Sequence, residues 1–506
     1  MSRRTLFTLS FIIVCFLALG LVACGSDEEP TPVEESTDIE EPATEEPVAD
    51  EPEEPPEEPP EEPAVELFGD PIRGGLLYDK WWKPVGADAP EDDHPLWATQ
   101  STNERSGDDT WRCKECHGWD YKGADGAYGD GSHFTGFTGI MQWAGGDANE
   151  ILATLMGSTS PDHDFSTAMD EQALTDIALF ISQEMIDYGP FIDAEKMASG
   201  GDVATGDDLF QETCAECHGP EGMAVNFSSD VSDSDYVSGI AGGNPWEFFH
   251  KMRFGQPGEP EMTAAVDIGW SEDEQLAVLA FAQSLPNSNP VTQGGLLYDK
   301  WWNAIGADAP EEDQPLWATQ DTNERSGADS WRCKECHGWD YQGAEGAYAE
   351  GSHFTGFTGI LDAGSMSTEE LLGWLNGATN SDHDFSGVMD EAVLEMLAAF
   401  MQEGLTDMTM YINDDKTVNG DGAKGEQLYN AGCTRCHGDD GHEINFGDDA
   451  EPEYLSDLAN GNPWETLHKA AYGQPGKDMP SGINLGWSTQ DLADLLAYIQ
   501  TLPGAE

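Results

Sequence analysis

The chain has 506 residues, too many for one ordinary domain, and 38% of them are hydrophobic, enough to build packed cores. It carries 98 acidic residues against 21 Lys and Arg, which gives a formal net charge of −77. Because phosphate binding depends on Lys and Arg, this balance excludes a nucleic-acid partner.

The N-terminus has the pattern of an export signal, which we assign to residues 1–23. Two arginines precede an apolar run over residues 6–23, the order found in cleaved signal peptides. An uncleaved membrane anchor is the alternative. The letters "LVAC" before Gly25 resemble a bacterial lipobox, which implies that Cys24 becomes the lipidated first residue. We therefore predict an exported protein, anchored to a membrane by lipid and facing a periplasm or the cell exterior.

Residues 24–66 form a predicted linker. Glu, Asp and Pro dominate this segment, which contains no Lys or Arg. Like-charge repulsion and proline extend such a chain, and too few apolar residues remain to form a core. We predict a disordered acidic tether between the lipid anchor and the folded part.

The rest of the chain is a tandem duplication of a two-part unit. Residues 74–140 align with residues 294–360 at an offset of 220. The second part recurs too, since "GNPWEFFHKMRFGQPG" from Gly243 matches "GNPWETLHKAAYGQPG" from Gly461. We name the four predicted domains A1 (67–190), B1 (191–288), A2 (289–410) and B2 (411–506).

Cysteine spacing indicates the chemistry. Apart from Cys15 and Cys24, all of the ten cysteines lie in Cys-x-x-Cys pairs followed at once by histidine. The motifs are Cys113/Cys116/His117, Cys214/Cys217/His218, Cys333/Cys336/His337 and Cys433/Cys436/His437. Two thiols at this spacing attach one haem covalently, and the adjacent histidine reaches the iron as the proximal ligand. Zinc sites and redox dithiols also use Cys-x-x-Cys, but neither requires the histidine. We predict four covalently bound haem c groups.

With these motifs the sequence resembles class I cytochrome c. The resemblance implies an all-α fold of four tandem haem domains in A-B-A-B order. In each, an N-terminal helix precedes the haem motif and a C-terminal helix crosses the first. The B domains fit closely: Ser271 and Glu274 predict a capping box at the start of the last helix of B1. The aromatic pairs expected at the crossings are Phe210 with Phe281 and Tyr429 with Tyr498.

The A domains fit more loosely, because an insert containing "YDKWW" and "DAPEDDHPLWATQ" precedes the haem motif. We expect its tryptophans to bury a haem edge, and Trp111, Trp119 and Tyr121 to pack beside the porphyrin. Lys114 and Glu115, between the two thiols, are interpreted as a pair that carries little information.

The resemblance also implies a distal ligand upstream of the last helix. In the B domains we predict Met262 and Met479, since each follows "GQPG" and precedes the N-cap serine by nine residues. The rival residues are His250 and His468, whose position within a helix favours packing or a contact with a haem propionate.

In the A domains we predict His163 and His383, seven residues before the capping residues Asp170 and Asp390. The alternatives are Met169/Met389 and His133/His353. An apolar residue directly before an N-cap usually packs on its own helix, which is why the methionines come second.

An electron-transfer protein with four haems is the leading functional hypothesis. Haems with both axial positions filled exclude substrate, and no other catalytic motif occurs. His/His ligation predicts low reduction potentials in the A domains, and His/Met ligation predicts higher ones in the B domains. The expected partners are redox proteins with basic docking patches.

Two other classes of function stay open. A haem enzyme, such as an oxidase of a small sulfur compound or a peroxidase, would need an open or labile haem in an A domain. Thiosulfate dehydrogenases use a cysteine as the distal ligand, and this chain has no cysteine to spare. A surface protein that only docks is the third possibility.

Overall fold

The computed structural model describes residues 66–228, 230–258, 262–448 and 450–505. The predicted signal segment, Cys24 and the linker up to residue 65 lie outside them. Every regular element within the described residues is a helix, and extended chain forms only isolated bridges such as Gly123 with Thr138. The all-α prediction is confirmed at this level. None of these helices is both long and apolar enough to cross a membrane.

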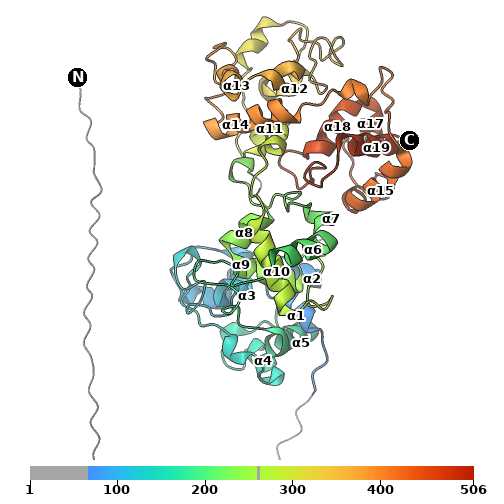
Figure 1. Ribbon diagram of the computed structural model, residues 1–506. Helices are drawn as coiled ribbons and strands as arrows, with labels where there is room; N and C mark the ends of the chain where they lie inside the picture. The colour runs from blue at the N-terminus through green and yellow to red at the C-terminus, as the bar shows by residue number, and fades with distance from the viewer. Residues whose placement is uncertain (1–65, 229, 259–261, 449, 506) are drawn as a thin grey trace, which may run out of the picture. The chain divides into compact units, whose positions relative to one another are not determined.

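The first half of the duplication contains ten α-helices and the second half contains nine, within the described residues (Figure 1). A1 contains α1 (Pro71–Leu77), α2 (Trp82–Val85), η1 (Pro95–Thr99), η2 (Gly107–Trp111), α3 (Cys113–His117), η3 (Gly131–His133), η4 (Met141–Trp143), α4 (Ala148–Leu155), η5 (Pro161–His163), α5 (Glu171–Leu179) and η6 (Phe180–Glu184). B1 contains α6 (Val203–Thr213), α7 (Ala215–His218), η7 (Val231–Asp233), α8 (Val237–Gly243), α9 (Pro245–Phe254) and α10 (Glu272–Ser284).

The second half follows the same order. A2 contains α11 (Pro290–Ala304), η8 (Pro315–Thr319), η9 (Gly327–Trp331), α12 (Cys333–His337), η10 (Leu361–Ser365), α13 (Thr368–Leu375), α14 (Glu391–Ala399), η11 (Phe400–Gly404) and η12 (Met408–Met410). B2 contains α15 (Gly422–Gly432), α16 (Thr434–His437), α17 (Leu455–Gly461), α18 (Pro463–Tyr472) and α19 (Thr489–Ile499). The elements η6 and η11 are single π-helical turns at the ends of α5 and α14.

Capping residues fix where the crossing helices begin. The predicted capping box of Ser271 with Glu274 at α10 is confirmed, and Ser488 forms the same box with Asp491 at α19. Asp170 and Asp390 cap α5 and α14, as predicted. In each case an oxygen of the cap accepts from a backbone N–H that the helix itself leaves unpaired.

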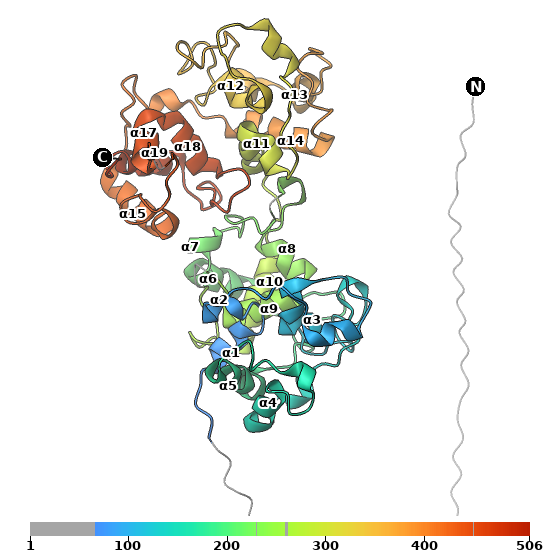
Figure 2. The ribbon, with the colours of Figure 1, turned by 180° about the vertical axis from the view of Figure 1, so that it is seen from behind.

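Four pairs of helices pack across each other in the same way, with a glycine at the point of contact. The pairs are α1 with α5, α6 with α10, α11 with α14 and α15 with α19. Figures 1 and 2 show α1 beside α5 from both sides. Each first helix carries a glycine at the crossing, and a Cβ there would overlap a carbonyl oxygen of the partner helix. The glycines and carbonyls are Gly74 with Asp176, Gly206 with Ala277, Gly294 with Met396 and Gly425 with Asp494.

Four residues after each glycine, an aromatic ring meets the aromatic ring of the partner helix. The predicted pairs Phe210–Phe281 and Tyr429–Tyr498 are confirmed, with ring centroids 5.3 and 5.4 Å apart. Tyr78–Phe180 and Tyr298–Phe400 repeat the arrangement in A1 and A2 at 5.7 and 5.5 Å. The same register therefore organises all four segments, including the two that the sequence matched only loosely.

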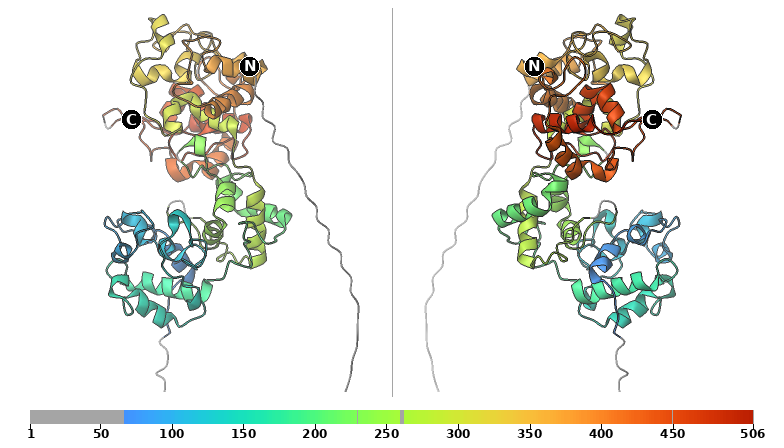
Figure 3. Two further views of the ribbon diagram at one scale, coloured as in Figure 1. Left: turned by 90° about the vertical axis from the view of Figure 1, so that its left-hand side faces the viewer. Right: turned by 90° about the vertical axis from the view of Figure 1, so that its right-hand side faces the viewer.

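A second glycine lets the first helix of each A domain approach a B domain. A Cβ on Gly75 would overlap the ring of Phe254 in α9, and one on Gly295 would overlap the ring of Tyr472 in α18. One core of buried side chains accordingly runs through A1 and B1, and another runs through A2 and B2. Figure 3 shows the blue and cyan helices of A1 beside the green helices of B1.

We predict that Gly425→Ala destabilises the protein by about 1–3 kcal/mol, because the new methyl group overpacks the crossing of α15 and α19. Gly422→Ala is the matched control in the same helix, where a Cβ meets nothing within 4 Å. It should be neutral or stabilising by up to about 1 kcal/mol, the helix propensity gained by replacing glycine. Chemical denaturation of both variants measures these changes in stability. Equal denaturation midpoints would contradict the close packing of α15 and α19 at Gly425.

Candidate functional site

A cavity of about 430 Å³ lies in A1 beside the first Cys-x-x-Cys-His motif. This volume falls in the range of roughly 300–1,000 Å³ usual for ligand and cofactor sites. Its lining is mostly apolar and includes Tyr78, Trp111, Phe137, Ile140, Trp143, Ile151, Leu155, Phe165 and Ile177. Its polar groups include the four that the sequence predicted, Cys113, Cys116, His117 and His163, together with others such as His94, Arg112 and Gln142.

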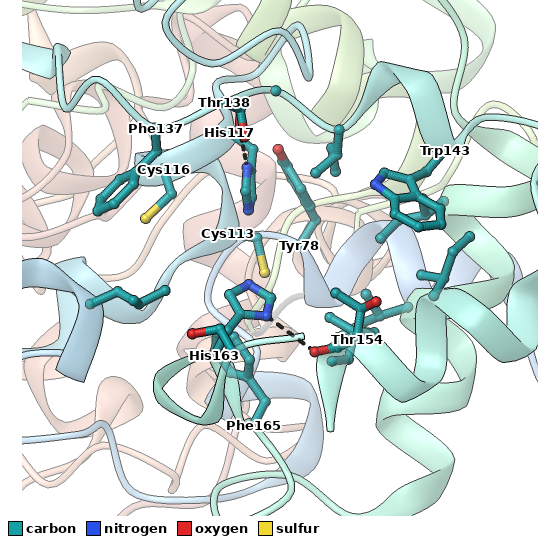
Figure 4. Close-up of a pocket in the computed structure, with 18 of the residues that line it drawn as sticks. Tyr78, Cys113, Cys116, His117, Phe137, Thr138, Trp143, Thr154, His163 and Phe165 are labelled. Atoms are coloured by element: carbon teal, nitrogen blue, oxygen red, sulfur yellow. Dashed lines mark hydrogen bonds between the residues drawn. The ribbon is translucent and has the colours of Figure 1, made fainter. Parts of the chain in front are cut away.

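His117 and His163 face each other in this cavity (Figure 4). Their ring centroids are 6.3 Å apart, and their planes are inclined at 70°. In A2, His337 and His383 repeat the arrangement at 6.3 Å and 66°. The chain therefore holds two opposed pairs of imidazoles, each beside two thiols.

Backbone carbonyls orient the four imidazoles. Nδ1 of His117 donates to the carbonyl of Thr138 at 2.8 Å, and Nδ1 of His163 lies 3.4 Å from the carbonyl of Thr154. Nδ1 of His337 and of His383 lie 2.7 and 2.9 Å from the carbonyls of Thr358 and Trp374. A proton held on Nδ1 leaves Nε2 as the lone-pair donor, the arrangement usual for metal-ligating histidines. Burial lowers the pKa of His117 and of His337 to about 4, so both are neutral at pH 7.

The thiols do not have the properties of a redox dithiol. Burial raises the pKa of Cys113 and of Cys333 to about 12. A catalytic or disulfide-exchanging cysteine needs a lowered pKa, because the thiolate is the nucleophile. Two protonated thiols beside two opposed imidazoles in an apolar cavity fit a covalently attached haem, which Cys113 and Cys116 would hold and which His117 and His163 would ligate.

The insert forms one wall of the A1 cavity. Its residues His94 and Leu96 line the cavity, but its tryptophans Trp81, Trp82 and Trp97 do not, so the wall does not support their predicted role in burying a haem edge. Trp111, next to the haem motif, does line the cavity. The His94 ring stacks on Phe165 at 5.0 Å and lies 6.4 Å from the ring of His163. In A2, Gln314 stands in its place, and its amide donates to the carbonyl of Asp382 at 2.7 Å. The insert therefore places a different polar side chain at this position in A1 and in A2.

The alternative ligands of the A domains lie elsewhere. Met169 and Met389 are buried in the two hydrophobic cores and do not belong to the A1 cavity wall. His133 and His353 stack on Tyr128 and Tyr348 at 4.4 Å, next to the glutamate between the two thiols. Of the three candidates in A1, only His163 shares the cavity wall with His117.

The interpretation of Lys114 and Glu115 as uninformative is wrong. Glu115 is fully buried, and the ammonium group of Lys114 pairs with its carboxylate. Arg105, Arg112 and His133 approach the same carboxylate at 3.5, 3.8 and 3.5 Å. A2 repeats the cluster around Glu335. "CKECH" recurs unchanged in both A copies while the B copies differ, which was the signal available in the sequence.

Trp119 and Tyr121 do not line the A1 cavity, so that part of the prediction is wrong. They pack instead at the junction with B1, where Trp119 lies 5.0 Å from the ring of His250. Tyr121 donates to Nδ1 of His250 at 2.7 Å, and Nε2 of His250 donates to the carbonyl of Gly75 at 3.0 Å. Burial lowers the pKa of His250 to about 3, which keeps the ring neutral. The packing role predicted for His250 is confirmed.

His468 repeats this junction in the second half. Its Nδ1 accepts from Tyr341 at 2.7 Å, and its Nε2 donates to the carbonyl of Gly295 at 2.9 Å. The two B-domain histidines thus join an A domain to a B domain, and their ring nitrogens are occupied by protein groups. This arrangement removes them as rival distal ligands.

The B-domain motifs have a more open environment. Cys217 and Cys436 are exposed, while Cys214 and Cys433 are partly buried. Within the described residues, Nδ1 of His218 and of His437 is buried without a hydrogen-bond partner. Phe227 and Phe446 lie 6.1 Å from these rings.

The predicted distal methionines of the B domains are half-buried. Met479 lines a small cavity of about 80 Å³ together with Met223, Thr292, Tyr472 and Asn484. His437 is not part of that wall. Ligation by Met262 and Met479 therefore stays a prediction.

Comparison with known proteins supports one of the four segments directly. Residues 422–503 match the family model described as cytochrome c. No curated protein matches the chain. Among solved structures, the chain is similar to the thiosulfate dehydrogenase TsdBA from Marichromatium purpuratum in its "as isolated" form. The identity is 17%, over 80% of this chain and 90% of that chain, and the TM-score is 0.20, too low to carry an argument. A cytochrome c domain implies covalent haem c and electron transfer, and the four motifs supply four candidate attachment sites.

We predict that Glu115→Gln destabilises the protein at pH 7 by about 3 kcal/mol, because it leaves a buried cluster of cations without its carboxylate. Burial alone would raise the pKa of Glu115, but His133, Lys114 and Arg105 outweigh it and lower the pKa from 4.5 to about 2. The carboxylate therefore stabilises the fold above pH 4.5, and this contribution is lost as the pH falls toward 2.

Denaturation of Glu115→Gln and the native protein between pH 7 and pH 2 measures this contribution. The difference in unfolding free energy should shrink as the pH falls. Glu104→Gln is the control, because Glu104 is exposed in the same segment. A Glu115→Gln protein as stable as the native one at pH 7 would contradict the role of the cluster.

Proposed function

We propose that the protein is a membrane-tethered c-type cytochrome with four haems that transfers electrons between redox partners outside the cytoplasm. The four haem domains are A1, B1, A2 and B2, with the boundaries given above. The observation that carries this proposal is the pair of opposed imidazoles beside two thiols, present in both A domains. The cytochrome c match to residues 422–503 supports the same assignment for B2.

Metal geometry supports His163 and His383 as the distal ligands. A bond from a metal ion to an imidazole nitrogen is about 2 Å long. Each nitrogen lies about 1 Å from its ring centre, so two imidazoles on opposite sides of one metal ion have centres about 6 Å apart. The observed separation of 6.3 Å in both A domains matches this value.

In the B domains we propose Met262 and Met479 as the sixth ligands. Both precede the capping serine of the last helix by nine residues, and both serines occupy that position in the structure. Two other methionines of B1 have no methionine at the equivalent position of B2, because Met223 corresponds to His442 and Met252 to Ala470. Only the Met262/Met479 pair recurs at this place in the loop.

Bound haem c would supply reversible one-electron oxidation and reduction. The protein residues set its potential and its access. Imidazole on both sides favours the ferric state, whereas a thioether on one side raises the reduction potential. His163 and His383 would also fill the position at which a substrate could otherwise bind. The A domains are therefore proposed as low-potential carriers and the B domains as high-potential carriers.

The charge and the N-terminus support the proposed location and partners. A cytochrome c domain implies a protein outside the cytoplasm. We propose that Cys24 is lipidated and that the acidic linker separates the haem domains from the membrane. With a net charge of −77, the surface attracts redox partners with basic patches and repels acidic ones. Salt at physiological strength screens that attraction beyond about 8 Å.

A haem enzyme is the alternative, and it needs an iron whose sixth position is open or labile. Every cysteine in residues 66–506 belongs to a haem motif, so none is free to act as a distal thiolate. A histidine lies opposite the proximal one in both A domains. Electron transfer is the function that these observations favour.

A potentiometric titration of the haem-loaded protein should resolve two groups of potentials with equal amplitude. His163→Met and His383→Met should each move a haem from the low group to the high group, because a thioether replaces an imidazole. His133→Met is the control and should move none, since that ring lies outside the cavity wall. A single high-potential cluster in the native protein would contradict His/His ligation.

Carbon monoxide added to the reduced native protein should leave the haem spectrum unchanged if all sixth positions are filled. His163→Ala should create a carbon monoxide site, because it vacates the position opposite His117. Met169→Leu should not, because Met169 is a core residue. Binding by the native protein would favour the enzyme instead.

A further inference from the structure

The two B domains meet at their haem-attachment segments. Nη1 of Arg435 lies 3.6 Å from Sγ of Cys217. Arg435 stands between Cys433 and Cys436, so it belongs to the attachment segment of B2, whereas Cys217 belongs to that of B1. Helix α7 of B1 and helix α15 of B2 pack together, and they lie side by side in both views (Figures 1 and 2).

A close backbone contact lies next to this pair. A Cβ on Gly219, directly after the proximal histidine of B1, would overlap the carbonyl oxygen of Asn484 in B2. The Asn484 side chain is buried, and its amide donates to the carbonyl of Met223 at 2.7 Å. Asn289 donates to the Asn484 side-chain oxygen at 2.8 Å. Buried, mutually satisfied polar groups fix this contact in one register.

The contact is formed by residues that differ between the two copies of the repeat. Arg435 corresponds to Glu216 in B1, and Asn484 corresponds to Asp267. Gln293, whose amide donates to Ser234 at 2.8 Å, corresponds to Arg73. These replacements change charge or hydrogen-bonding capacity where the halves touch. In the first half of the chain, the hydrogen-bond acceptors for these contacts are Cys217, Met223, Val231 and Ser234, and all four belong to B1.

We propose that electrons cross between the two halves of the chain at this contact, directly between the haems of B1 and B2. The inference rests on the proposed function, because it requires a haem bound to each B motif. Cys217 would be bonded to one haem, and Arg435 would lie between the two cysteines that hold the other. One side chain then separates the two attachment segments, and outer-sphere electron transfer becomes rapidly slower as the gap widens.

The step moves one electron and breaks no bond. The reduced haem of one B domain is oxidised, the ferric haem of the other is reduced, and no proton is required. The two proposed His/Met haems then form the centre of the path, and each His/His haem of an A domain communicates with the other half through its own B domain. The Arg435 guanidinium is a positioning group that holds the segments together; the electron resides on the haems.

Flash reduction of the full-length, haem-loaded protein tests the proposal. One electron per molecule is injected, and its redistribution is followed by haem absorbance. Arg435→Glu replaces the guanidinium by the carboxylate that B1 carries at the equivalent position, Glu216. Asn484→Asp removes the amide that donates to the carbonyl of Met223. The double variant should slow redistribution severalfold without changing the midpoint potentials. Hydrogen exchange at residues 219–223 should rise with it, because the contact opens.

Lys83→Glu is the control, because it makes the same charge change as Arg435→Glu on an exposed side chain of α2. It should leave the rate unchanged. An unchanged rate in the double variant would overturn the proposal, and so would rapid exchange at residues 219–223 in the native protein. Failure of the proposed function looks different: the purified chain would then lack four haems or would not titrate reversibly. If the purified chain holds four haems that titrate in two groups, an unchanged rate in the double variant contradicts only the proposed electron transfer between the B1 and B2 haems.

Discussion

The close crossing of two helices at a glycine is the constraint on which the rest of this structure depends. In three of the four segments the aromatic residue one turn after the glycine is a tyrosine that donates to the carbonyl of the glycine following the haem histidine. These bonds run from Tyr78 to Gly118, Tyr298 to Gly338 and Tyr429 to Gly438, at 2.8, 2.6 and 2.7 Å. B1 has Phe210 at this position and lacks the bond. The crossing thus fixes both the terminal helices and the end of the attachment segment between them, which is why the A domains keep the arrangement despite their insert.

The duplication acts at the level of an A-B pair. Two adjacent glycines in α1 and α11 let one helix pack closely against two others, so an A domain and its B domain share one core. Buried His250 and His468 complete each junction with two hydrogen bonds to neutral partners. In so acidic a chain, the buried clusters around Glu115 and Glu335 concentrate several of the few cations beside the A-domain thiols. That placement holds the attachment segment rigid where a haem would be bonded to it.

Features set by local spacing or helical register could be predicted from the sequence. The motifs, the helix caps and the aromatic pairs of the B domains are of this kind, because each depends on residues a fixed number of positions apart. His163 could be expected opposite His117 because the resemblance to class I cytochrome c implies a distal ligand on the loop before the last helix. The roles of Glu115, Trp119 and Tyr121 could not be predicted this way, because they depend on which surfaces pack together. The contact of Arg435 with Cys217 joins residues 218 positions apart, beyond the reach of any local pattern.

The contact between the halves also explains why their differences sit where they do. It is heterologous, since an attachment segment of B1 meets a loop of B2, and such contacts between like units can propagate into open chains. For this contact to repeat between molecules, the B2 segment after His437 of one chain would have to meet the B1 surface of a second chain. That B1 surface carries Glu216 and Asp267 in the places of Arg435 and Asn484. That surface offers carboxylates where the existing contact uses the guanidinium of Arg435 and the amide of Asn484. A carboxylate cannot donate to a backbone carbonyl, and two more charges would be buried without partners. The divergence that joins the two halves therefore also leaves B1 without the donors that a second copy of the contact would need.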